Sequence, residues 1–211
     1  MWRPKMMQIP TPEEALPGRK DALSVEPEHF VNGRDIRGEC PPGLQEILVG
    51  MGCFWGAERL FWQLPGVEVT SVGYGGGHTR NPTYDEVCSG HTGHTELVRI
   101  WFDPTVTSLD AILKVFWENH DPTQGMRQGN DIGTQYRSAI YTPDDAALET
   151  AVASRDRYQR SLSAASYPDI TTELRSGVVY YLAETYHQQY LAKNPNGYCG
   201  LAGCQVSFPS S

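Results

Sequence analysis

The stretch Ile47-Leu48-Val49-Gly50-Met51-Gly52-Cys53-Phe54-Trp55 decides the fold, because a buried strand gives way to a helix within it. The apolar run at residues 47–49 predicts the strand, and residues 54–63 repeat apolar side chains as a helix does. Cys53 therefore lies at a helix start, where unpaired backbone N–H groups favour the thiolate. The rings that follow it can wall an apolar pocket beside the sulfur. The alternative is a buried structural cysteine.

The composition is that of an ordinary soluble globular protein. The 211 residues, 39% of them hydrophobic and 20% charged, suffice for one domain with a full core. A net charge of −8 without clustered Lys or Arg argues against a nucleic-acid partner. No apolar run approaches the ~20 residues that cross a bilayer, and no secretory signal is evident at the N-terminus. We expect a cytoplasmic protein without membrane partners, monomeric by default.

Cysteine usage favours the same compartment. The chain holds five cysteines, an odd number, at positions 40, 53, 88, 199 and 204. In a reducing cytosol such residues are more often catalytic, redox-active or buried than joined in structural disulfides. Cys88 is expected to be buried, and Cys40 to have a packing or incidental surface role rather than a catalytic one.

Three parts follow each other along the chain. Residues 1–43 are rich in proline and predict an arm that wraps the domain surface. Residues 44–194 alternate strand and helix patterns and form the predicted catalytic α/β domain. Residues 195–211 form a glycine-rich tail. We expect an α+β fold, a two-layer α/β sandwich with a mixed sheet and a ferredoxin-like core, extended at both ends.

The expected elements of the domain follow from periodicity and caps. Strands are expected at residues 47–49, 67–74 (with a bulge at Thr70-Ser71), 95–102, 136–141 and 170–174. Helices are expected at 54–63, 84–88, after the N-cap Ser108, at 144–165, and around 184–191, with a loop at 124–135.

Glu96 is the second candidate for chemistry. Strand alternation places it on the same face as Val98 and Ile100. A carboxyl group on an apolar face loses hydration, so its pKa is expected to rise toward the range of a general acid. The alternative is a glutamate at a strand end that reaches solvent.

The tail supplies a pair of thiols. Cys199 and Cys204 lie five residues apart among glycines, and a flexible pair of this kind suits a disulfide relay. Two incidental cysteines are the alternative. Zinc is not expected, because no four-ligand set is complete, and His91 and His94 are more often merely polar loop residues. We expect neither a metal nor a cofactor.

Four further residues are weak candidates when taken separately. Tyr84 and Tyr136 could donate phenolic O–H groups into a pocket, although most tyrosines lie at the edge of a core. Asp131 lies in a glycine-rich loop, where making a turn is the ordinary role. His187 is expected on a helix, where a structural role is more common.

Together these motifs resemble the A-class peptide-methionine sulfoxide reductases, over roughly residues 44–204. The resemblance is carried by Gly52-Cys53-Phe54-Trp55-Gly56-Ala57-Glu58, Gly73-Tyr74-Gly75-Gly76-Gly77, Asn81-Pro82-Thr83-Tyr84, Gly93-His94-Thr95-Glu96, Phe116-Trp117-Glu118-Asn119-His120-Asp121-Pro122, the run from Gln128 to Ser138, His187-Gln188-Gln189-Tyr190-Leu191 and Gly197-Tyr198-Cys199-Gly200.

The resemblance implies a reaction and a role for each candidate. Cys53 would attack the sulfur of a methionine S-sulfoxide, in a protein or free, whose methyl group packs on Phe54 and Trp55. A protonated Glu96 would protonate the sulfoxide oxygen, with Tyr84 and Tyr136 as further donors, and Asp131 and His187 would help to bind the substrate. The resulting Cys53 sulfenic acid would condense with Cys199, and thioredoxin would be the final reductant.

The chain departs from the family pattern in two places. Thr95 stands where alanine is common. The second recycling cysteine of the family often lies near the position of Ser207, whereas Cys204 is the only candidate here.

Two other functions remain open from the residues. A thiol peroxidase would also use a low-pKa cysteine and a resolving thiol, but peroxide needs no methyl pocket. A redox sensor or a methionine-binding module would bind sulfoxide, or oxidise at Cys53, without turnover, and would leave Glu96 without a role.

Overall fold

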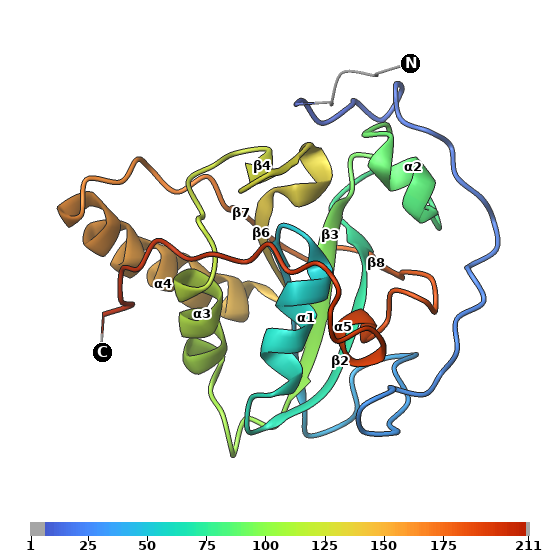
Figure 1. Cartoon of the computed structure of the whole chain (residues 1–211), viewed down its shortest axis with the longest axis horizontal. Helices are drawn as coiled ribbons and strands as arrows, with labels where there is room; N and C mark the ends of the chain where they lie inside the picture. The colour runs from blue at the N-terminus through green and yellow to red at the C-terminus, as the bar shows by residue number, and fades with distance from the viewer. Residues whose placement is uncertain (1–6, 210–211) are drawn as a thin grey trace.

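The computed structural model describes residues 7–209, so residues 1–6 of the arm and 210–211 of the tail lie outside it. Six strands form one mixed sheet in the order β7-β6-β1-β3-β2-β8 (Figure 1). These strands are β1 (Gln45–Met51), β2 (Val67–Gly75), β3 (Thr95–Phe102), β6 (Ser138–Thr142), β7 (Glu173–Ser176) and β8 (Tyr180–Leu182). A second, two-stranded sheet pairs β4 (Arg127–Gln128) with β5 (Asp131–Ile132).

The strand pairings explain why the sheet is mixed. The four central strands β6, β1, β3 and β2 are antiparallel to one another, and β8 adds antiparallel to β2. Only β7 pairs in parallel, with β6. The prediction of a mixed α/β architecture is confirmed, and β7 and β8 extend the sheet on either side of the four central strands.

Five α-helices accompany the sheet within the described residues: α1 (Phe54–Trp62), α2 (Tyr84–Cys88), α3 (Leu109–Glu118), α4 (Asp145–Ala164) and α5 (Tyr190–Lys193). Ser108 and Asp144 cap α3 and α4 by accepting hydrogen bonds from the backbone N–H three residues on. In Figure 1, α1 lies across the central strands with α3 and α4 beside it. The apolar faces of these three helices share one core with the strands beneath them.

The proline-rich arm covers the opposite face of the sheet. Its buried Ile36 and Val25 pack on Trp101 of β3 and Val69 of β2. The Arg99 guanidinium lies over the rings of Trp101 and Tyr180, with its carbon 4.3 and 4.8 Å from the two ring centroids. Arg99 also donates hydrogen bonds to the arm carbonyls of Gly38 and Ile36. A buried cation thus fastens the arm to the sheet.

Several expected elements differ from the structure. The irregularity of β2 lies between Val67 and Val69, not at Thr70-Ser71. The loop expected at 124–135 contains the β4–β5 pair, and Tyr136 belongs to a short 3₁₀ turn instead of the strand that follows. The strand expected from residue 170 begins at Glu173, and the short strand β8 was not expected.

The helix expected around 184–191 is mostly a series of turns. Gln189 has a φ of 47°, which interrupts a right-handed helix, and α5 begins only at Tyr190. The Gln188 side chain accepts from the backbone N–H of Val72 and donates to the Val72 carbonyl. A side chain therefore pairs with β2 where the sequence pattern indicated a helix.

Ile36→Ala tests whether the arm is part of the folded core. Ile36 is fully buried against the sheet, so the variant should lose about 2–5 kcal/mol of unfolding free energy in urea titrations. Val31→Ala is the matched control, because Val31 lies on the same arm and is 49% exposed; it should change stability by less than about 0.5 kcal/mol. Equal stability of the two variants would show that the arm contributes no core.

Candidate active site

The turn between β1 and α1 places the half-buried Cys53 at the helix start. Gly52 has a φ of 86°, and a Cβ there would lie 2.6 Å from the Cβ of Gln128, so only glycine makes this turn. Gln128 is held in place by two hydrogen bonds to the backbone of Asp121. Cys53 is the N-cap residue of α1, as the sequence predicts.

A cavity of about 180 Å³ opens beside Cys53. Most of the residues predicted for the site converge on it, from α1, α2, β3 and the β4–β5 region. Its lining consists of Cys53, Phe54, Trp55, Tyr84, Glu96, Asp131, Tyr136 and Tyr198. Segments far apart in the sequence thus meet around one thiol.

Glu96 is buried at the start of β3, with 2% of its surface exposed. The backbone N–H of Phe54 donates to its Oε2 at 3.0 Å, which ties β3 to the first turn of α1. Burial raises the pKa of Glu96 to about 8, the Phe54 hydrogen bond opposes this shift, and the charge of Asp131 adds to it. The carboxyl group is therefore protonated at neutral pH, in the direction that the sequence predicts.

The pKa of the Cys53 thiol is shifted in the opposite direction to that predicted from the sequence. Burial raises its pKa well above the ordinary value, and the charge of Glu96 raises it further. A hydrogen bond from the Trp55 backbone N–H lowers the pKa, as expected of a helix start, but it does not outweigh burial. The expected resting thiolate is therefore wrong, and Cys53 is a neutral thiol at neutral pH.

Two phenols face the same cavity. Burial raises the pKa of both Tyr84 and Tyr136, so both keep their O–H protons across the physiological range. Tyr84 begins α2, and its backbone N–H donates to Glu184 at 2.8 Å. The site thus holds three neutral proton donors besides the thiol.

His187 lies behind the cavity instead of in its lining. It is 1% exposed and sits in the turn before α5, not on the expected helix. Its Nδ1 accepts a hydrogen bond from the indole Nε1 of Trp55 at 3.0 Å, and burial lowers its pKa to about 4, which keeps the ring neutral. The Trp55 ring also stacks on Tyr190, with centroids 3.9 Å apart. His187 therefore orients the pocket wall.

The two tail cysteines have different surroundings. Cys199 is exposed, and its sulfur lies against Gly56 in the first turn of α1. Cys204 is buried in the main core, with its sulfur 4.0 Å from the carbonyl oxygen of His120. Burial, together with Asp121, raises the Cys204 pKa to about 12. Of these two cysteines, Cys199 is the one whose charge acts on the Cys53 thiol.

Sequence reasoning missed Tyr198 and Gln128. The Tyr198 O–H donates to Asp131 at 3.3 Å across the mouth of the cavity, and its only sequence signal is its position next to Cys199. Gln128 fills the space over Gly52. The only sequence signal for this contact is the glycine at position 52, which allows another residue to pack closely against the backbone.

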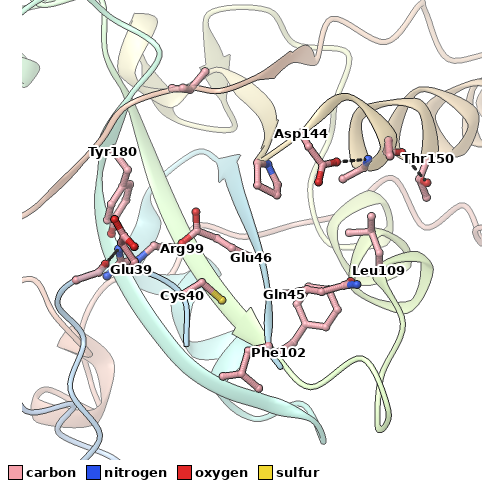
Figure 2. A pocket seen from close by; sticks show the side chains of 16 residues that line it. Glu39, Cys40, Gln45, Glu46, Arg99, Phe102, Leu109, Asp144, Thr150 and Tyr180 are labelled. Carbon is pink, nitrogen blue, oxygen red and sulfur yellow. Dashed lines mark hydrogen bonds between the residues drawn. The ribbon is translucent and has the colours of Figure 1, made fainter. Parts of the chain in front are cut away.

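A larger cavity of about 730 Å³ lies on the other face of the sheet (Figure 2). It is bordered by the arm, Arg99, Tyr180 and the start of α4, and none of the residues predicted for chemistry lines it. Within residues 7–209, no three His, Cys, Asp or Glu side chains come together as metal ligands. Nor does that part of the chain contain a helix with the length and hydropathy to cross a membrane.

Known proteins resemble this chain over most of its length. The sequence model of the family described as "Peptide methionine sulfoxide reductase" matches residues 45–206. Proteins named peptide methionine sulfoxide reductase MsrA are similar to it: that of Vibrio vulnificus is 65% identical and aligns over 93% of this chain and 94% of its own. That of Pseudomonas aeruginosa is 61% identical over 98% and 96%. The alignments therefore include most of the arm.

Solved structures of methionine sulfoxide reductases are also similar to this chain. Methionine sulfoxide reductase A of Corynebacterium diphtheriae superposes with a TM-score of 0.82 at 44% identity, covering 94% of this chain and 99% of its own. Mxr1 of Saccharomyces cerevisiae in reduced form gives a TM-score of 0.71 at 31% identity, covering 81% and 94%. The chain belongs to the peptide methionine sulfoxide reductase family, as an oxidoreductase of the MsrA type that reduces methionine sulfoxide.

Proposed function

We propose that the chain reduces the S epimer of methionine sulfoxide, in oxidised proteins and as the free amino acid, through a sulfenic acid at Cys53. The observation that carries this proposal is the shared cavity of Cys53 and a buried, protonated Glu96, walled by Phe54 and Trp55. Apolar walls accept a methyl group, and an apolar surrounding keeps the acid neutral. The S epimer follows from the MsrA type, since one enzyme serves each sulfoxide epimer.

In the first step the sulfur of Cys53 attacks the sulfoxide sulfur while Glu96 gives its proton to the sulfoxide oxygen. The attack forms an S–S bond between Cys53 and the substrate sulfur. The protonated oxygen then moves to Cys53, so that this S–S bond and the S–O bond of the substrate break as the S–O bond to Cys53 forms. Methionine leaves with its sulfur reduced by two electrons, and Cys53 becomes a sulfenic acid, oxidised by two. The thiol proton of Cys53 returns to Glu96, so the site ends with its protons restored. Tyr84 and Tyr136 donate further hydrogen bonds to the oxygen.

In the second step Cys199 attacks the Cys53 sulfenic acid. A Cys53–Cys199 disulfide forms, and the hydroxyl group leaves with the thiol proton as water. Thioredoxin then reduces the disulfide by thiol exchange. Yeast Mxr1 has been solved "in complex with Trx2", a likeness that at 20% identity and a TM-score of 0.52 supports only the fold. We carry thioredoxin to this chain on the strength of the exposed Cys199.

The role of Cys204 as the second recycling thiol stays a prediction, and it requires a change in the position of Cys204. Its sulfur is buried, and the Tyr167 O–H donates to its carbonyl at 3.1 Å. Cys204 must leave this packed position before its thiol can reach a Cys53–Cys199 bond.

Cys53→Ser should lose turnover entirely, because serine cannot form the sulfenic acid. When both epimers of N-acetyl-methionine sulfoxide are assayed with dithiothreitol, the unchanged protein should reduce the S epimer alone. Cys40→Ser is the control, since Cys40 lies on the other face of the sheet, and it should keep full activity. Appreciable turnover by Cys53→Ser, or peroxide consumption without any sulfoxide reduction, would overturn the proposal.

The single-turnover rate should fall as pH rises through about 8, where Glu96 loses its proton. Glu96→Gln should reduce the rate about 10²–10⁴-fold and remove this fall, measured by methionine release between about pH 6 and 9. Stability is a second readout. The folded pKa exceeds the ordinary 4.5, so the folded state holds the extra proton and loses stability as pH rises from about 4.5 to 8. Glu96→Gln should reduce that loss; a flat pH profile in the unchanged protein would contradict the assignment.

Cys204→Ser should leave single-turnover reduction unchanged and slow the thioredoxin-coupled rate, because the chain then lacks a second thiol for exchange with Cys199. Cys204→Ala, with the same readouts, controls for packing in the core. Coupled rates equal to those of the unchanged protein would show that thioredoxin reduces the Cys53–Cys199 bond directly.

A further inference from the structure

Gly56 is buried in the first turn of α1, directly beneath the tail. A Cβ placed on it would lie 2.8 Å from the sulfur of Cys199 and 3.2 Å from Cγ of Leu201. Both distances are shorter than the ~3.5–4.0 Å at which nonbonded carbon atoms ordinarily pack. The backbone of Gly56 is helical, so its conformation does not require glycine; the space that the tail occupies does.

The position of Gly56 in the helix gives this contact a consequence. Residues three apart lie on the same face of a helix, about 5–6 Å from Cβ to Cβ, so residue 56 is the neighbour of Cys53 on that face. A sulfur resting on Gly56 is therefore held beside the catalytic thiol. The charge of Cys199 also contributes to the raised pKa of Cys53, as expected of two nearby thiols.

A second contact holds the same part of the tail. The Tyr198 O–H donates to Asp131, one residue before Cys199. Leu201, two residues after Cys199, packs on the core that α1 belongs to. The tail is thus fixed on both sides of Cys199, and the surface between the two contacts is the bare backbone of Gly56.

We propose that Gly56 is a positioning residue for the recycling step: because it has no side chain, the thiol of Cys199 can lie on its backbone beside Cys53. We call this contact between Cys199 and Gly56 the seat. This inference rests on the proposed function, in which Cys199 resolves the Cys53 sulfenic acid. The seat acts on the second step alone. Gly56 is not part of the cavity lining, so substrate binding and oxygen transfer proceed without it.

An added methyl group at position 56 should displace the tail and not the helix. Alanine is the best helix former, so Gly56→Ala favours α1. The atoms that it would strike are the ends of side chains on the tail. Restoring ordinary contact distances moves the Cys199 sulfur by about 1 Å, and a misplacement of about that size can slow a positioned reaction on the order of 10²-fold.

The experiment follows one equivalent of N-acetyl-methionine S-sulfoxide through both steps in the full chain. Rapid quenching measures methionine release, dimedone labelling measures the sulfenic acid, and peptide mass spectrometry measures the Cys53–Cys199 disulfide. We expect Gly56→Ala to release methionine at the unchanged rate and to form the disulfide on the order of 10²-fold more slowly. The labelled sulfenic acid should accumulate in between.

Two further variants separate a seat from general packing. Gly56→Ala in a Cys199→Ser background should change nothing relative to Cys199→Ser alone, because the methyl group then has no resolving thiol to displace. Leu201→Phe enlarges the tail side of the same contact and leaves the helix as it is. It should also slow disulfide formation, and it decides the matter if Gly56→Ala does not fold.

The outcomes distinguish this inference from the proposed function. Disulfide formation at the unchanged rate in both Gly56→Ala and Leu201→Phe would overturn the seat. Methionine release slowed by the same factor as disulfide formation would overturn it too, because the substitution would then act on Cys53 or on the fold. If the unchanged protein forms no Cys53–Cys199 disulfide at all, it is the proposed recycling step that fails.

Discussion

The hydrogen bond from the Phe54 backbone N–H to the buried carboxyl of Glu96 is the interaction on which the site depends. It joins the start of β3 to the first turn of α1, so the proposed acid and the proposed nucleophile are held in one rigid frame. Because the same contact lies out of water, Glu96 keeps its proton near neutral pH. The hydrogen bond sets the geometry, and burial of the carboxyl group, which outweighs the opposing effect of that bond on the pKa, sets the protonation state.

A second buried carboxyl group supports that frame from below. Glu58 of α1 accepts hydrogen bonds from the backbone and side-chain N–H groups of Gln189 at 2.8 and 2.7 Å, and from Thr70 of β2 at 3.0 Å. Gln189 lies in the sequence between His187 and Tyr190. These two residues orient Trp55, His187 through a hydrogen bond and Tyr190 through ring stacking. The apolar wall of the pocket is thus fixed by polar contacts within the core.

Local patterns predicted the parts of the fold that local physics determines. The strand-to-helix turn at Cys53 and the N-cap Ser108 follow from short-range rules, and the Ser108 cap forms as expected. The prediction failed where distant contacts decide. Gln188 replaces a helix by pairing with β2. Cys53 is neutral because burial in the folded chain, with Glu96 as the second cause, raises its pKa. Burial of this kind cannot be read from the neighbours of a residue alone.

The neutral thiol also bears on the choice between a reductase and a peroxidase. Peroxide reduction depends on a standing thiolate, since the thiolate is the nucleophile and peroxide has no basic oxygen for an acid to protonate strongly. Burial beside Glu96 disfavours such a thiolate. A sulfoxide oxygen is a better acceptor for the Glu96 proton, and its arrival gives the Cys53 proton a destination. In the proposed mechanism the thiol is therefore activated only when the substrate is present, which would limit its reaction with general oxidants.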